Sequence, residues 1–167
     1  LKMHIRYYLQ AESNSDFFKR FIKRMEGDYN HSKNIVANIL LLLFVSKRGL
    51  SEWELLDITG ISALDFSPIY FSLENHLFES HGILKIAHRY LRNAISEYYN
   101  EKQTYFRKAR AALITYFRKR PFEDRSVEEI SYQLFEMKEW ERLSEYYANL
   151  KVLQKNMQRD RYEFIRH

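Results

Sequence analysis

The sequence predicts a mainly α-helical protein: a winged helix, which is a helix-turn-helix with a short β wing, followed by antiparallel helical hairpins that begin an α-superhelix. Three observations predict this. Apolar residues recur at helical spacing along most of the 167 residues. Only four Gly and two Pro occur, which favours long helices and short turns. One segment, 83–87 (ILKIA), alternates enough for a short strand.

The first two helices are predicted from their apolar faces. Residues 16–26 place their apolar side chains on one helical face, and Ser15 or Asp16 can cap that helix. Residues 33–47 are apolar nearly all round, so we expect a central, buried helix. Gly49 can end it in a left-handed conformation.

The next elements give the order of a winged helix. Ser51 opens a short helix with a capping box, since Glu54 follows three residues later, and the helix ends at Gly60. A third helix is predicted over 68–78, with its proline in the first turn. The strand at 83–87 follows a turn. A second strand would complete the wing, but the pattern does not locate one.

The remainder of the chain is predicted to be helices joined by short turns. Ser126 and Glu129 suggest another capping box, and Glu128 and Glu129 are expected in a first turn near the helix dipole. The aromatic side chains of Trp53 and Trp140 are expected in the core. No internal repeat is visible. The helices are predicted over 89–99, 101–119, 126–135, 139–150 and 151–160.

Charge is divided unevenly along the chain. Residues 49–84 contain six carboxylates and no Lys or Arg, so their formal charge is −6. The whole chain carries +5, so the remaining residues carry +11. A helix-turn-helix that binds DNA needs cations beside the phosphates, and this one would repel them. The charge therefore predicts protein contact. The acids are Glu52, Glu54, Asp57, Asp65, Glu74 and Glu79.

Composition and motifs argue against several function classes. There is no Cys, which excludes disulfides and thiolate metal sites, and a zinc site at His76 and His81 lacks a supporting motif. The longest apolar run, 39–45, is far shorter than the ~20 residues of a membrane span. No phosphate-binding loop or nucleophile elbow is present, so we expect no catalysis and no cofactor in this chain. The absence of Cys favours a cytoplasmic location. The start at Leu1 rather than Met leads us to expect a piece of a longer protein.

Three segments carry a resemblance to a known family, and they are 17–29 (FFKRFIKRMEGDY) leading into 35–43, then 48–56 (RGLSEWELL), then 84–95 (LKIAHRYLRNAI). In this order they resemble the signal-transducing STAND NTPases, the class that includes NACHT and apoptotic-ATPase-like proteins. The first looks like the end of the ATPase lid and the entry to the winged helix, the second like the entry to the second winged-helix segment, and the third like the strand, histidine and helix that close the winged helix. Residues 129–134 (EISYQL) are similar to the superhelical segment behind it.

The resemblance implies a division into 1–30, the helical end of the lid, 31–99, the winged helix, and 100–167, the superhelical segment. It implies one functional residue, His88, because the histidine that closes the winged-helix strand in this class contacts the β-phosphate of ADP. An imidazole can donate a hydrogen bond to phosphate. Arg89, where some families carry an acid, can bind phosphate directly or point to solvent.

The function implied is regulation rather than catalysis. The segment would hold the nucleotide-binding domain of its parent closed around ADP, with ATP and Mg as the parent's other ligands, and would couple it to a C-terminal sensor. Its partners would be the parent's ATPase core and proteins that contact the acidic winged helix and C-terminal helices. The parent would oligomerise on activation.

Two alternatives remain open. The winged-helix order and a pI of about 9.3 suit a nucleic-acid-binding domain, although the third helix offers only Asn75 and His76 as base-contacting side chains and no cation. The basic helices could also contact RNA or DNA without sequence preference. A plain helical protein-interaction scaffold is the other alternative, since the C-terminal helices can form a groove for a partner.

Overall fold

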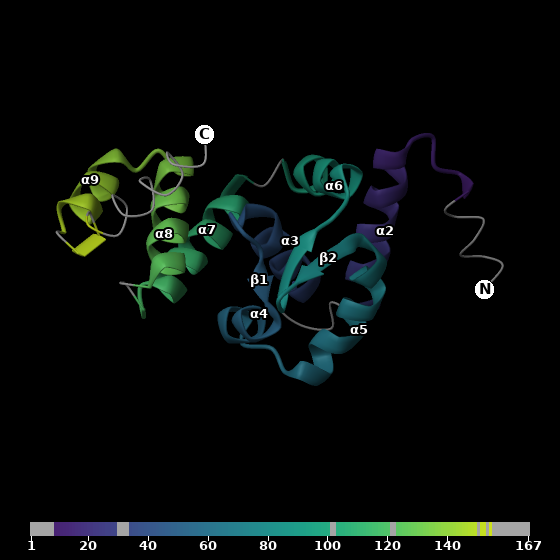
Figure 1. The fold of residues 1–167 in the computed structure, drawn as a ribbon. Helices are drawn as coiled ribbons and strands as arrows, with labels where there is room; N and C mark the ends of the chain where they lie inside the picture. Colours follow the sequence, from purple (N-terminus) through teal and green to yellow (C-terminus); the bar gives the residue numbers. More distant parts are fainter. Residues whose placement is uncertain are drawn as a thin grey trace, which may run out of the picture. The chain divides into compact units, whose positions relative to one another are not determined.

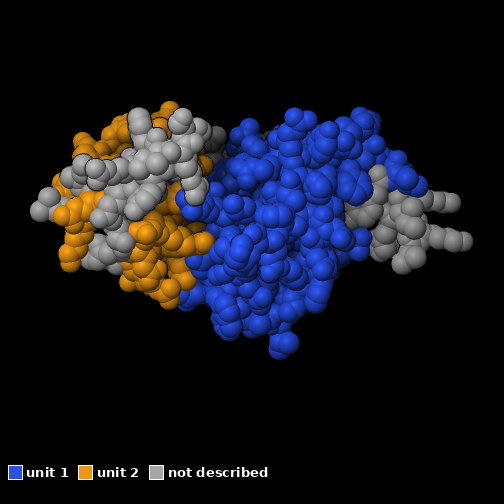
Figure 2. All heavy atoms as spheres, viewed as in Figure 1, with its two compact units in different colours: residues 1–109 blue, residues 110–167 orange. Residues whose placement is uncertain are grey.

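The chain divides into two compact units, 1–109 and 110–167, with the boundary inside helix α7 (Figure 2). A computed structural model describes residues 9–29, 34–100, 103–120, 123–149, 151, 152 and 154. The described residues are mainly helical, as predicted, with one small antiparallel sheet (Figure 1). None of the helices in these described ranges is both long and apolar enough to cross a membrane.

Unit 1 is built around helix α3, Ile35–Val45. Nine of its eleven residues are buried, so the helix is packed on nearly all sides, as its apolar composition predicts. At its C-terminal end, the Phe44 ring lies 5.4 Å from Phe106 of α7 (Gln103–Phe117), and the Arg92 guanidinium lies 4.7 Å from the Phe44 ring. The Arg92 side chain also donates to the Phe44 carbonyl at 3.2 Å. These contacts join the end of α3 to the following helices.

The sheet has the strand order β1-β3-β2, with β1 at Leu50–Ser51, β2 at Leu77–Ser80 and β3 at Ile83–Ile86. The sequence predicted β3 but not its partners. Strand β1 has only two residues and is defined by its pairing with β3. The hairpin between β2 and β3 turns at His81 and Gly82, both at positive φ, as a two-residue hairpin turn requires.

Helix α4, Glu52–Thr59, forms as predicted. The Ser51 hydroxyl accepts from the backbone N–H of Glu54, the Ser51 N–H donates to the Glu54 carboxylate, and Gly60 ends the helix at φ 68°. This capping box satisfies two helix-end N–H groups at once, which explains why a local sequence pattern sufficed to place the helix.

The predicted boundaries of the next helix are wrong. Helix α5 spans Ala63–Leu73, so it begins five residues before the proline. The Ser62 hydroxyl caps it by accepting from the backbone N–H of Asp65. Pro68 therefore lies inside the helix, where its missing N–H leaves the carbonyl of Leu64 without its helical partner. That loss is tolerated because Leu64 and Pro68 both lie on the exposed side of α5, where water can bind the carbonyl. A 3-10 turn, η1 (Glu74–His76), then leads into β2.

We expected Gly49 to end helix α3, but it does not. The helix ends at Val45, with Ser46 as its C-cap. Gly49 instead lies directly before β1 at φ +86°, and a Cβ there would lie 2.3 Å from the Leu84 carbonyl oxygen. Glycine is therefore required by the close approach of two strands and by the left-handed backbone together.

Helix α2, Asn14–Tyr29, packs against α6, Arg89–Tyr99. The hydroxyls of Tyr98 and Tyr99 both donate to the Glu26 carboxylate, at 2.9 and 2.6 Å. Burial raises the pKa of Tyr99 far above its usual value, and the hydrogen bond to Glu26 is the second largest cause. In the N-terminal half of α2, Lys19 pairs with Glu97 of α6 at 2.5 Å. These polar contacts set the register of the two helices.

The N-terminal cap of α2 differs from the prediction. Neither Ser15 nor Asp16 caps it. The Ser13 hydroxyl accepts from the backbone N–H of Asp16. Ser15 donates instead to the Glu97 carboxylate, and the Asp16 carboxylate accepts from Arg20, which lowers the pKa of Asp16. Ser13 was not among the predicted caps, and the three-residue spacing to the backbone N–H of Asp16 is what identifies it.

Unit 2 contains α8, Asp124–Glu136, and α9, Trp140–Ala148, which pack against each other. The predicted capping box at Ser126 is wrong. The helix begins two residues earlier, and Ser126 is buried within it. Glu128 and Glu129 are also buried, and they lie in the second turn of the helix rather than in the expected first turn. Most of the predicted helix over 151–160 lies outside the described residues.

A polar chain runs through the interior of unit 2. The Arg110 guanidinium donates to the Gln133 amide oxygen at 2.7 Å, and the Gln133 amide nitrogen donates to the Glu129 carboxylate at 2.6 Å. Arg110 also pairs with Glu136 at 3.0 Å. Gln133 is fully buried, so its two hydrogen bonds offset the cost of removing its amide from water.

Candidate functional site

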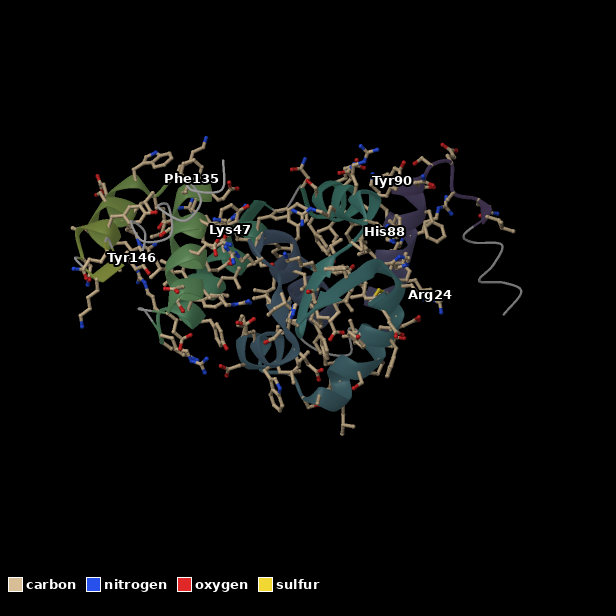
Figure 3. The ribbon with its side chains drawn as sticks, viewed as in Figure 1. Arg24, Lys47, His88, Tyr90, Phe135 and Tyr146 are labelled. Atoms are coloured by element: carbon tan, nitrogen blue, oxygen red, sulfur yellow. The ribbon has the colours of Figure 1, made fainter. Side chains whose placement is uncertain are left out.

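The candidate site lies where β3 passes into α6 (Figure 3). His88 is the N-cap residue of α6, with an extended backbone and no capping hydrogen bond from its side chain. One residue earlier, the Ala87 N–H donates to the His76 carbonyl at 2.9 Å. The junction is therefore fixed by backbone pairing, while the His88 side chain stays exposed and takes no part in the cap.

The His88 ring is the outermost member of an aromatic cluster that α2, η1 and α6 form together. It lies edge-on to His76, with ring centroids 5.8 Å apart. His76 in turn packs edge-on against Phe18 at 5.1 Å and Phe21 at 5.4 Å, both on α2. Helix α2 thus orients His76, and His76 forms the surface on which His88 rests.

His76 is half-buried, and burial lowers its pKa, with the neighbouring His88 lowering it further. Its Nδ1 atom is buried and has no hydrogen-bond partner within the part of the chain that the structure describes. The neutral form of the inner histidine is therefore favoured, whereas the outer histidine is accessible to solvent and to a ligand. This arrangement leaves His88 able to donate a hydrogen bond to an incoming anion.

Arg89 follows His88 in the first turn of α6 and is also exposed. Its guanidinium lies 5.5 Å from the centroid of the Tyr90 ring, which is a cation–π distance. The structure thus brings His88 and Arg89 to the same helix end, and neither side chain is buried. The predicted contact of His88 with ADP, and of Arg89 with phosphate, remains a prediction.

A second surface, on α5, was not anticipated. Leu64 is 85% exposed and Phe71 is 66% exposed. The buried face of α5 consists of Phe66, Ile69 and Leu73. With the Ser62 cap as the helix start, helical spacing would have placed Leu64 and Phe71 opposite that buried face.

The two tryptophans also lie outside the core, contrary to prediction. Trp53 on α4 is 81% exposed and Trp140 on α9 is 54% exposed. Trp140 contacts Phe135, itself exposed, at a ring distance of 5.4 Å. Each unit therefore presents aromatic side chains to solvent, which is typical of surfaces that bind other proteins.

Three carboxylates lie close to Tyr70, the α5 residue next to Phe71. The Tyr70 hydroxyl donates to the Glu79 carboxylate at 3.3 Å, and the Tyr70 ring lies 5.8 Å from Phe71. Burial raises the pKa of Tyr70, and the negative charges of Glu79, Glu74 and Glu52 raise it further. These three acids come from β2, η1 and α4, so the fold brings three of the six carboxylates of the acidic segment close to one tyrosine of α5.

The described residues contain no group of three or more His, Cys, Asp or Glu side chains that could hold a metal ion. His76 and His81 serve different parts of the structure. His76 packs against α2, whereas His81 lies in the hairpin turn with its Nδ1 3.0 Å from the Ser80 hydroxyl.

Comparison with known proteins gives one distant relative and no family. No family model matches the chain, and no solved structure matches it. A TPR repeat-containing protein of Dictyostelium discoideum is 23% identical over 160 residues, which is 93% of this chain and 10% of that protein. The chain therefore spans about a tenth of the length of this relative.

Proposed function

We propose that this chain is a non-catalytic regulatory segment of a STAND-type ATPase of the NACHT class, which holds the nucleotide-binding domain of its parent closed and couples it to a sensor. The observation that carries the proposal is the order of elements that ends at His88. A central helix is followed by a strand, two helices, a hairpin and a further helix. This order, with the strand order β1-β3-β2, supports a winged helix over 31–99.

In this proposal His88 contacts the β-phosphate of ADP bound to the parent's nucleotide-binding domain. Its exposed ring, at the N-terminus of α6, supports this role, because an anion is stabilised there by the helix dipole. Arg89 is a second residue that can reach a phosphate. Residues 1–30 act as the helical end of the ATPase lid, and 100–167 carry strain from the sensor. Activation is a shift to an open state, followed by oligomerisation in the cytoplasm.

The proposal predicts the behaviour of a full-length parent that carries His88→Ala. ADP should dissociate faster, since the closed form loses a phosphate contact, and the open form should become more populated. His81→Ala is the matched control, because His81 is also an exposed histidine of unit 1 but lies in the hairpin turn. Equal ADP dissociation rates in the wild type and the His88→Ala variant would remove His88 from the mechanism.

A helical protein-interaction scaffold is the second candidate, and the relative whose name records TPR repeats favours it. TPR repeats are helical hairpins that stack into binding surfaces. As a scaffold, the chain would bind a partner protein without any nucleotide dependence. Addition of ADP to the full-length protein would then leave partner binding unchanged, whereas the regulatory proposal expects ADP to weaken or strengthen it.

Nucleic-acid binding is the third candidate. Its support is the net positive charge of the whole chain and the winged-helix order. Against it, the exposed side of α5 presents Leu64, Pro68 and Phe71 where a DNA-reading helix would present polar and cationic side chains. A duplex that binds at low salt, withstands nonspecific competitor and weakens as salt rises would favour this candidate.

A further inference from the structure

Helix α5 carries an apolar stripe that points away from the core. Leu64, Pro68 and Phe71 are spaced by four and then three residues, so they follow one another along one side of the helix for two turns. All three are exposed. We call this stripe the α5 outer face. An exposed apolar stripe with helical spacing is the arrangement by which one helix packs against another.

The surroundings of this stripe define the charge of what can bind there. Tyr70 lies beside Phe71 and bonds to Glu79, with Glu74 and Glu52 also close enough to act on it electrostatically. No Lys or Arg occurs between residues 49 and 84. The next cation along the chain is Lys85, on β3 opposite Phe78 of β2.

From these two observations we infer that the α5 outer face binds a basic amphipathic helix of a partner protein. The partner's apolar side chains would cover Leu64, Pro68 and Phe71, and its Lys or Arg side chains would pair with Glu52, Glu74 and Glu79. Anionic lipid and nucleic acid do not suit this surface, since its carboxylates repel phosphates. The inference rests on the proposed function only in treating the chain as a protein-binding segment.

The binding can be measured with the whole chain and a defined probe. The probe is a synthetic helical peptide of ~15 residues, with Leu at positions i, i+3, i+4 and i+7 of each two turns and Lys elsewhere. The control peptide has Glu in place of every Lys. Fluorescence anisotropy of each labelled peptide gives the dissociation constant. We expect the basic peptide to bind and the acidic peptide to fail, with an affinity that falls as salt rises.

Variants of the protein locate the binding surface. Phe71→Ala and Leu64→Ala should each weaken binding by about tenfold, because exposed anchors of this kind carry most of the energy of a small interface. Both side chains are exposed, so their removal should leave thermal unfolding unchanged. Tyr90→Ala is the matched control. Tyr90 is an exposed aromatic residue of unit 1, but it lies on α6 outside the acidic segment.

Three outcomes would overturn the inference. The basic peptide does not bind; it binds all the variants equally; or the chain alone forms a dimer in sedimentation equilibrium that Phe71→Ala abolishes, which would make a second copy the occupant. The test is separate from that of the proposed function, since it involves neither His88 nor a nucleotide. Peptide binding lost in Phe71→Ala, with ADP dissociation unaffected by His88→Ala, would leave this inference standing and the nucleotide role refuted.

Discussion

Helices α3 and α8 each bury most of their residues, yet the buried residues differ in polarity. In α3 every buried residue is apolar. In α8 the buried set includes Ser126, Glu128, Glu129, Ser131 and Gln133. Apolar burial is non-directional and tolerates changes of salt and pH, whereas a buried polar group is stable only while its hydrogen-bond partners are in place.

This difference in buried polarity indicates which unit is the more sensitive to a change in its surroundings. Unit 1 has a core that should stay folded while its surface binds partners. Unit 2 depends on directional contacts such as Arg110–Gln133–Glu129, so a displaced helix would leave buried polar groups without partners. A rigid unit followed by a conformationally sensitive one suits the proposed transfer of a signal along the chain.

The largest expected effect is in the apolar core. Leu40→Ala, at a fully buried position of α3, should lower the free energy of unfolding of unit 1 by about 2–5 kcal/mol, from lost burial and the cavity left behind. Leu64→Ala is the matched control and should change it by less than about 0.5 kcal/mol. Urea unfolding of both variants checks this. Equal losses would contradict the assignment of α3 as the core.

Gly49→Ala should have the next largest effect. The new Cβ would meet the Leu84 carbonyl at 2.3 Å, and the φ of +86° is unfavourable for alanine, so we expect a loss of about 1–3 kcal/mol. Gly27→Ala is the control. It lies within α2 with nothing near its Cβ position, and should stabilise the chain by about 0.5–1 kcal/mol. The difference in thermal unfolding midpoint between the two variants is the readout.

Unit 2 should respond most to a polar change. Gln133→Leu would remove one hydrogen-bond partner from Arg110 and one from Glu129, and should cost about 1–3 kcal/mol. Each unit contains one tryptophan, so Trp140 fluorescence in a Trp53→Phe background follows the unfolding of unit 2 alone. Gln10→Leu, at an exposed position, is the control. A neutral or stabilising Gln133→Leu would show that the polar chain is dispensable for stability.

The smallest effect concerns pH. Because the pKa of His76 is lowered in the folded state, the unfolded state takes up its proton first as pH falls below about 6.5. The stability that His76 contributes through its lowered pKa is therefore fully present above about pH 6.5 and is lost as the pH falls through the folded-state pKa of His76. His76→Phe should reduce the difference in urea midpoint between pH 7.5 and 5.5, while His81→Asn should preserve it. An unchanged difference in His76→Phe would refute this cause.

The sequence located elements whose signals are local. The capping box of Ser51 and Glu54, the glycine at position 60, and the helix over 89–99 all appear in the structure as predicted. Errors arose where two local signals competed. Pro68 suggested a helix start, but the Ser62 cap determines it, and the Ser126–Glu129 spacing imitated a capping box inside a helix.

Tertiary features lay beyond the sequence patterns. A two-residue strand such as β1 has no periodicity of its own and exists only through its pairing with β3. The exposure of Trp53 and Phe71 depends on which side of a short helix meets the core, and tertiary packing determines that side. At the candidate site, the resemblance pointed to His88, whereas the packing of His76 against Phe18 and Phe21 required the fold.

The most direct test of the regulatory proposal is to determine the coding sequence upstream of Leu1 in the transcript that encodes this chain. The proposal predicts a nucleotide-binding domain there, with a phosphate-binding loop of the form G-x-x-x-x-G-K-[ST] followed by an acidic strand. A transcript whose upstream coding sequence contains no such domain would contradict the proposal and leave the chain as a protein-interaction module.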